Sequence, residues 1–196
     1  MPIPKILVLP GSTRTASHNV KLAALAAKEL TLLDVDVTRI SLADYPLPIY
    51  EADFDAREGP PATAVTLTHM IMAHHGVFIA SPEYRASVTP MLKNAIDWVS
   101  RVRERGDPTY AAFKGRVFAI SSASPGRAGG LRSLMALRQI LELGCGALVI
   151  PEQVAIQRAD YAFDEMDNIA DTGTANLFRA QLERLVEMAR LMLRGG

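Results

Sequence analysis

Strict alternation of apolar runs with helical patterns is the feature that most constrains the fold of this chain. Five short apolar runs predict buried strands, at Lys5–Leu9, Val35–Ile40, Val77–Ala80, Val117–Ser121 and Ala147–Ile150. Five amphipathic segments predict helices, at Asn19–Leu30, Pro61–Ala73, Pro90–Arg101, Leu131–Leu143 and about Thr174–Leu193. This order predicts an α/β fold in which a parallel sheet is covered on both faces. With 196 residues, we expect residues 1–196 to form a single domain.

Two stretches carry no regular pattern. Ala43–Gly59 contains two prolines, and Gln153–Gly173 is rich in aspartate. We expect surface loops, which could also form the rim of a site or a contact between subunits.

Charge and cysteine content narrow the function classes. The chain has 21 basic and 21 acidic residues and a formal net charge of +0, which argues against a dedicated nucleic-acid binder. No apolar stretch is long enough to span a membrane, and no signal peptide is recognisable, so we expect a cytoplasmic protein. Cys145 is the only cysteine, which excludes an intramolecular disulfide and a cysteine zinc cluster. We expect it to be a small packed residue.

A polar run follows the first predicted strand directly, from Gly11 to Asn19. Ligands bind at the carboxyl ends of strands in open parallel sheets, so this run is a candidate binding loop. Arg14 offers a planar cation suited to a phosphate, and the next helix adds unpaired N–H groups. Hydroxyls are offered by Ser12, Thr13 and Ser17. Helix capping alone also favours Ser, Thr and Asn. Three hydroxyls and an arginine exceed what one cap needs, so the run predicts phosphate binding.

Two further loops follow the third and fourth predicted strands. Tyr84 lies in a proline-containing loop and is placed to lie beside a planar ligand. Gly126 lies in the segment Ser121–Gly130, whose three glycines permit close backbone approach to a ligand. The alternative to ligand binding is that these segments are only flexible loops before helices. Because the carboxyl ends of the strands share one edge, the three loops are expected to converge on one crevice.

Together these motifs resemble a known family. They are Gly11-Ser-x-Arg14-x-x-Ser17-x-Asn19, Pro82-Glu83-Tyr84 continuing to Leu92-Lys-Asn-Ala-Ile-Asp-Trp98, and Ser124-Pro-Gly126 with Gly129-Gly130. The pattern is similar to that of NAD(P)H-dependent FMN reductases of the flavodoxin-like superfamily, which include chromate, quinone and azo reductases. The resemblance covers nearly the whole chain.

The resemblance implies a flavodoxin-like sandwich with strand order 2-1-3-4-5, FMN at the carboxyl edge and NADPH or NADH as co-substrate. It implies small-molecule acceptors such as quinones, chromate, ferric or azo compounds, and homodimers that often pair into homotetramers. The helix carrying Trp98 is expected to form a two-fold interface. The implied FMN-binding residues are Ser12, Arg14, Ser17 and Asn19 at the phosphate, and Pro82, Glu83, Tyr84, Arg85, Ser121 and Gly126 around the ring. No acid or base residue is required, because the nicotinamide passes its hydride to the flavin directly.

Arg85 departs from the family pattern, which usually has Asn after Pro-Glu-Tyr. A cation here would stabilise the anionic reduced flavin, attract the cofactor's extra phosphate, or point into solvent or an adjoining subunit. These alternatives stay open on the sequence alone.

Two other functions compete with the reductase interpretation. A flavodoxin-type electron carrier would share fold and FMN, although the neutral net charge disfavours it. A protein that binds another phosphorylated ligand is the second alternative, if Arg85 spoils the ring site. The four histidines lack metal-ligand spacing, so we expect no metal.

Overall fold

The computed structural model describes residues 3–194 and contains a five-stranded parallel sheet in the order β2-β1-β3-β4-β5. Its strands are β1 (Lys5–Pro10), β2 (Asp36–Arg39), β3 (Gly76–Ala80), β4 (Val117–Ala123) and β5 (Leu148–Ile156). The predicted fold class and strand order are therefore confirmed. The order in which successive strands are added reverses between β1 and β3, and open parallel sheets bind ligands at such a point.

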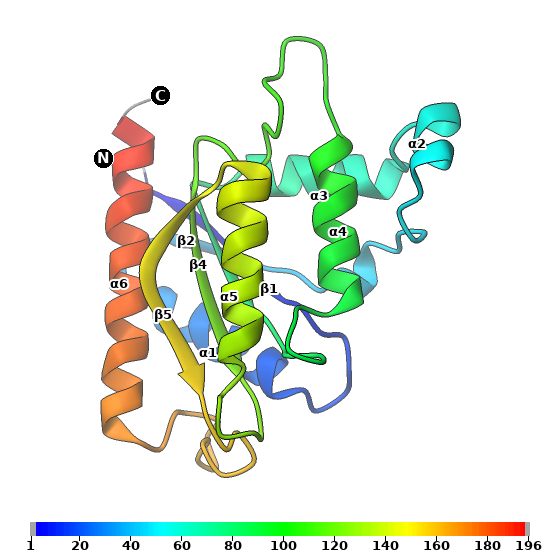
Figure 1. Ribbon diagram of the computed structural model, residues 1–196. Helices are drawn as coiled ribbons and strands as arrows, with labels where there is room; N and C mark the ends of the chain where they lie inside the picture. Colours follow the sequence, from blue (N-terminus) through cyan, green and yellow to red (C-terminus); the bar gives the residue numbers. More distant parts are fainter. Residues whose placement is uncertain (1–2, 195–196) are drawn as a thin grey trace.

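Helices cover both faces of the sheet (Figure 1). The helices α1 (His18–Leu30) and α6 (Thr172–Arg194) lie on one face, and α3 (Ala62–Met72), α4 (Pro90–Arg101) and α5 (Leu131–Gln139) lie on the other. Alternate residues of β1 serve the two cores: Ile6 and Val8 pack with α1 and α6, while Leu7 and Leu9 pack toward α3 and α4. The α5 helix continues as one π-helical turn, Ile140–Gly144.

The segment between β2 and α3 is more ordered than expected. It holds a short 3₁₀ turn, η1 (Leu42–Asp44), and a helix, α2 (Ala52–Glu58), that projects away from the sheet (Figure 1). Glu51 starts α2 because its carboxylate accepts hydrogen bonds from the N–H groups of Asp53 and Phe54, at 2.8 and 2.7 Å. Seven residues show too few turns for a periodic pattern, so the sequence analysis missed this helix.

Trp98 of α4 is covered by this same segment. Its indole N–H donates to the carbonyl of Pro48 at 2.7 Å, and the rings of Tyr50 and Phe54 pack edge-on against it, with centroids 5.0 and 5.9 Å away. The side chain is fully buried within the chain. Any contact of α4 with a partner subunit must therefore use other residues of the helix.

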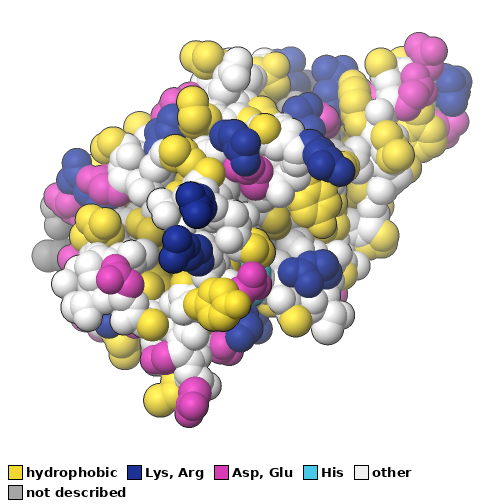
Figure 2. All heavy atoms as spheres, turned by 60° about the horizontal axis from the view of Figure 1, so that its bottom comes forward, with side chains coloured by type: hydrophobic (Ala, Val, Ile, Leu, Met, Phe, Trp, Pro, Cys, Tyr) yellow, Lys and Arg dark blue, Asp and Glu magenta, His cyan; other side chains and the backbone are white. Residues whose placement is uncertain are grey.

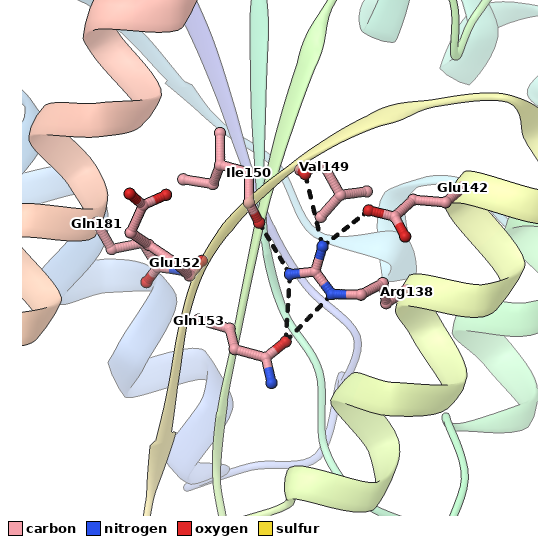
Figure 3. Close-up of polar contacts among 7 residues, drawn as sticks. All are labelled: Arg138, Glu142, Val149, Ile150, Glu152, Gln153 and Gln181. Atoms are coloured by element: carbon pink, nitrogen blue, oxygen red, sulfur yellow. Dashed lines mark hydrogen bonds and ion pairs between the residues drawn. The ribbon is translucent and has the colours of Figure 1, made fainter.

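The last strand runs six residues beyond its predicted end at Ile150, past Pro151. An irregularity accommodates the proline: Phe118 of β4 pairs with Val149, whereas Ile120 pairs with Gln153. Arg138 of α5 donates to the carbonyl of Ile150 at 2.8 Å and to the Gln153 amide oxygen at 3.3 Å (Figure 3). From the other face, Gln181 donates to the carbonyl of Ile120 at 2.9 Å. These contacts satisfy the disturbed backbone and let β5 reach the carboxyl edge.

The segment that follows β5, residues 157–171, is called the strap below. It is irregular, as expected, and leads back to α6. No helix among residues 3–194 is both long enough and apolar enough to cross a membrane.

Candidate active site

Three loops meet at the carboxyl ends of the central strands. The β1 loop (11–17), the β3 loop (81–89) and the β4 loop (124–130) approach one hollow. Its lining residues are Ser12, Arg14, Ser17, His18, Asn19, Pro82, Glu83, Tyr84, Ala123, Ser124 and Pro125. Figure 2 views the molecule from this end, where separate Lys and Arg side chains lie among hydrophobic and acidic ones. The structure thus brings together seven of the ten predicted cofactor-binding residues.

The β1 loop is shaped by its own hydroxyl groups. Ser17 caps α1, its Oγ accepting from the N–H of Asn19 at 3.3 Å, and the Oγ of Ser12 accepts from the N–H of Arg14 at 3.2 Å. The exposed guanidinium of Arg14 donates only to the carbonyl of Thr15, at 3.3 Å, and has no acidic partner among residues 3–194. A cation without a counter-charge, beside a helix N-terminus, suits an anionic ligand.

The side chain of Asn19 joins the β1 loop region to β4. Its side-chain amide donates to the carbonyl of Ala123 at 2.8 Å and accepts from the N–H of Ala123 at 3.0 Å. This buried pair of bonds fixes the start of α1 to the end of β4. These two bonds use the oxygen and one N–H of the amide, so Asn19 supports the β1 loop through the backbone while its second N–H takes no part in this contact.

Glu83 brings a negative charge to the hollow, and α5 neutralises it. Its carboxylate forms an ion pair with the guanidinium of Arg132 and accepts from the backbone N–H of Arg132 at 3.2 Å, at the first turn of α5. The guanidinium and the N-terminus of α5 both offset the negative charge of the carboxylate. The carboxylate therefore opposes an anionic ligand less than a free one would.

Tyr84 begins a tight turn that Ser87 closes. The two backbones exchange hydrogen bonds of 2.9 and 3.0 Å, and the two residues between them, Arg85 and Ala86, have φ of +48° and +63°. A turn with both central residues at positive φ is type I′, which favours Asn followed by Gly. This explains the usual Asn of the family pattern. The tyrosine side chain is 50% exposed at the mouth of the hollow.

Arg85 does not line the hollow. Its side chain is exposed and forms no ion pair among the described residues. This exposure is in keeping with the alternative in which Arg85 points into solvent or an adjoining subunit.

The glycines of the β4 loop have different roles. A Cβ on Gly126 would meet only the Ser124 hydroxyl, 3.7 Å away, so this position leaves room for a ligand. A Cβ on Gly129 would lie 2.7 Å from the carbonyl of Ala155, and one on Gly130 would collide with Ser122. The last two glycines therefore serve close packing within the chain rather than ligand approach.

Ser121 lies away from the hollow. It is fully buried, and its hydroxyl donates to the side-chain oxygen of Gln181 on α6 at 2.6 Å. Alternation explains this: successive residues of β4 face opposite sides of the sheet, and Ser121 faces α6. Its hydroxyl is not among the groups that reach the site.

Sequence reasoning missed His18 as a lining residue. It is the first residue of α1, directly after the cap, and this position next to a predicted phosphate loop is the signal that would have identified it. Cys145 lies elsewhere, packed in the core, where burial raises the pKa of its thiol to about 11. It is therefore unreactive as a nucleophile.

Comparison with known proteins adds an independent line of evidence. A family model described as NADPH-dependent FMN reductase matches residues 4–160. An NAD(P)H-dependent FMN reductase of Pseudomonas aeruginosa is 37% identical over 183 residues, covering 92% of each chain. A quinone reductase of Escherichia coli is 38% identical over 138 residues, covering 70% of this chain and 69% of its own. The solved structure of FerB, a flavoenzyme NAD(P)H:(acceptor) oxidoreductase of Paracoccus denitrificans, superimposes with a TM-score of 0.79 at 26% identity, over 97% of this chain and 99% of that one.

Proposed function

Since this chain belongs to the NADPH-dependent FMN reductase family, we propose that the hollow between the β1, β3 and β4 loops holds FMN for electron transfer from NAD(P)H to small acceptors. The chain is an oxidoreductase, with homologues named as FMN and quinone reductases. The observation that carries the placement is the convergence of the three loops around the unpaired guanidinium of Arg14.

The groups present fit a flavin phosphate. Arg14 supplies the cation, Ser12 and Ser17 supply hydroxyls, and the start of α1 supplies N–H groups. The single lining carboxylate, Glu83, is already paired with Arg132. In this proposal these groups of the β1 loop and the start of α1, called the cradle below, bind the dianion, and the open space at Gly126 admits the flavin beside it.

The remaining lining residues orient the ring. Pro82 and Glu83 border it through the backbone, and Tyr84 flanks its exposed side from a turn that the backbone holds in place. When bound, FMN accepts a hydride from the nicotinamide and passes electrons to the acceptor. The protein's part is to bind, orient and leave one face open, so the same opening serves both substrates in turn.

We also propose a homodimer, two of which pair into a homotetramer. The hollow is open to solvent and Tyr84 is half exposed, so a second subunit at α4 would cover more of the ring. Cytoplasmic location is a further proposal, in keeping with a single cysteine that is buried and unpaired.

An anaerobic titration tests the function. Purified protein saturated with FMN should show flavin absorbance that NADPH or NADH bleaches, and a quinone should restore it within turnover time. An electron carrier would show slow bleaching with either nicotinamide, and a protein for another phosphorylated ligand would take up no FMN. Either result would contradict the proposal.

A further inference from the structure

A second depression lies beside the hollow at the carboxyl end of the sheet. It is bounded by residues 155–156 at the end of β5, by the strap and by Thr174 of α6, and it is called the groove below. Figure 1 shows the strap at the end of the sheet to which β5 points. None of the residues assigned to FMN lines the groove. It is therefore available to a second ligand.

The β4 loop and the start of the strap form a wall that the groove and the hollow share. Ser124 lines the hollow, and its N–H donates to the carbonyl of Ile156, which lines the groove, at 3.0 Å. One residue pair further along, the N–H of Arg158 donates to the carbonyl of Gly126 at 3.4 Å. Gly126 is exposed, and a Cβ there would meet only the Ser124 hydroxyl, 3.7 Å away. The wall at Gly126 thus leaves room for an extended ligand to cross from the hollow into the groove.

Unpaired positive charge lies at this crossing. Arg158 lines the groove, and its exposed side chain forms no ion pair among residues 3–194. Arg127 follows Gly126 directly and is likewise exposed, without an acidic partner in the described part of the chain. Two cations without counter-charges favour an anionic ligand at this point.

Two carboxylates belong to the same part of the chain, and both have other partners. Asp171 lines the groove and accepts from the N–H and the hydroxyl of Thr174, at 2.7 and 2.8 Å. Asp160 has a carboxylate oxygen 3.0 Å from Nε2 of His18. Neither carboxylate lies within ion-pair distance of Arg158. An arriving anion would therefore not have to displace an acidic side chain from this guanidinium.

The groove also presents an aromatic ring to solvent. Tyr161 lines it and is 85% exposed. Its N–H donates to the carbonyl of Arg158 at 2.9 Å, which closes a turn and keeps the backbones of the two residues together. The lining beside the ring is apolar and includes Ala162, Ile169 and Ala170. A tyrosine ring next to small apolar residues suits contact with a flat, largely apolar ring of a ligand.

We propose that the groove binds the adenosine half of NADH and NADPH, with the guanidinium of Arg158 on the pyrophosphate and the ring of Tyr161 stacked on the adenine. The nicotinamide then lies in the hollow, and the co-substrate crosses the wall at Gly126. The pyrophosphate is the first anionic group along the co-substrate from the nicotinamide, so a cation next to the hollow meets it before the 2′-phosphate of NADPH. This inference rests on the proposed function and adds the second half of its substrate site.

Binding of ADP-ribose tests the assignment without electron transfer, because this fragment contains the adenosine and the pyrophosphate but no nicotinamide. Calorimetry measures its affinity for the FMN-saturated protein. Arg158→Ala should weaken binding about tenfold or more, as expected when a charge-assisted contact is lost. Tyr161→Ala should weaken it about fivefold or more, as expected when a base loses its stacking partner. Tyr161→Phe keeps the ring and should bind like wild type.

Flavin reduction by three nicotinamides separates the parts of the co-substrate. Anaerobic stopped-flow measurements on FMN-saturated protein give the half-saturating concentration of each. Arg158→Ala should raise it about tenfold for NADH, NADPH and reduced nicotinamide mononucleotide, which keeps one phosphate of the pyrophosphate. Tyr161→Ala should raise it for NADH and NADPH only, because the mononucleotide lacks the adenosine. The limiting rate and the FMN affinity should stay as in wild type.

Arg105→Ala is the matched control. Arg105 is also exposed and without an ion pair among the described residues, but it lies in the loop between α4 and β4, at the other end of the sheet (Figure 1). It should behave like wild type in both experiments.

Three results would overturn the inference. They are unchanged ADP-ribose affinity in Arg158→Ala or Tyr161→Ala, an effect of Arg158→Ala on NADPH alone, which would assign the cation to the 2′-phosphate, and a parallel loss of FMN affinity. A protein that binds FMN but is reduced by neither NADH nor NADPH would overturn the proposed function instead.

Discussion

Residue conformation explains the family preference that Arg85 breaks. Arg85 and Ala86 both occupy the left-handed region, which costs a residue with a Cβ roughly 1 kcal/mol and costs Asn less. We expect Arg85→Asn to raise the free energy of unfolding by about 0.5–1 kcal/mol, measured as a higher urea midpoint at unchanged slope. Arg127→Asn is the control, since Arg127 is also exposed but has no positive φ, and it should change stability by less than about 0.5 kcal/mol. A loss of stability in Arg85→Asn would show that the guanidinium makes a contact that outweighs the strain.

Single residues also mark the limit of sequence reasoning at the site. Ser12, Arg14 and Ser17 were predictable because a loop after a buried strand exposes its side chains at the sheet edge. Asn19 and Ser121 were harder to assign, because a polar side chain near a site can equally satisfy a neighbouring backbone or helix. Asn19 bonds to Ala123 and Ser121 bonds to Gln181, partners more than 50 residues away that no local pattern reveals.

At the scale of elements, the continuation of β5 depends on Arg138. Its guanidinium meets the carbonyl of Ile150 and the amide of Gln153, where Pro151 disturbs the ladder (Figure 3). Arg138→Met should lower the free energy of unfolding by about 1–3 kcal/mol, because polar groups lose their partners. Thermal or urea unfolding measures this, with Gln139→Met as the exposed neighbour on the same helix that should stay within about 0.5 kcal/mol of wild type. Equal stability of the two variants would mean that water replaces Arg138 as the hydrogen-bond partner of the Ile150 carbonyl and the Gln153 amide oxygen.

The turn between α3 and β3 predicts a pH dependence of stability. Burial, with Lys5 and Arg116 nearby, lowers the pKa of both His74 and His75 below the ordinary value of 6.5. A hydrogen bond favours the neutral form of His75 as well, because its Nδ1 accepts from the N–H of Lys5 at 3.0 Å and must be unprotonated to do so. The unfolded chain binds protons more readily, so stability is full above about pH 6.5 and is lost as pH falls through 6.5 toward the folded pKa.

His75→Asn should reduce this loss, since an amide oxygen can accept the same hydrogen bond without titrating. Urea midpoints at pH 7.5 and 5.5 measure it. His69→Asn, at an exposed position on α3, should leave the loss in place. If His75→Asn loses as much stability as wild type on acidification, these histidines do not carry the effect.

Elements differ in how well the sequence predicts them. The long amphipathic helices and the β-branched runs of the central strands were placed to within a few residues, because each shows a full period of its pattern. The end of β5 and the helix α2 were not placed, because contacts with residues distant in the sequence determine where both elements form. Arg138 and Gln181 carry β5 past a proline, and Trp98 anchors Tyr50 and Phe54 around α2.

For the whole molecule, the proposed dimer predicts a mass in solution of at least twice 21.3 kDa. Light scattering at working concentration measures it. Lys93 is exposed on α4 and pairs with Asp97 at 2.8 Å, so Lys93→Glu would place two like charges on the proposed contact and should raise the dimer dissociation constant by about tenfold. Lys114→Glu, exposed outside α4, should not. A monomeric protein with full reductase activity would exclude a partner subunit from the site.

The central claim is that the cradle at the start of α1 binds the phosphate of FMN through Arg14. The measurement that tests it most directly compares the affinities of FMN and riboflavin for wild type and Arg14→Ala by flavin fluorescence quenching, with Arg127→Ala as the control outside the hollow. A charge-assisted contact contributes roughly 1.5–3 kcal/mol, so Arg14→Ala should weaken FMN binding about tenfold or more. Riboflavin should bind Arg14→Ala as it binds wild type, and Arg127→Ala should bind both flavins normally. Equal losses of FMN and riboflavin in Arg14→Ala, or no loss of either, would contradict the placement of the phosphate.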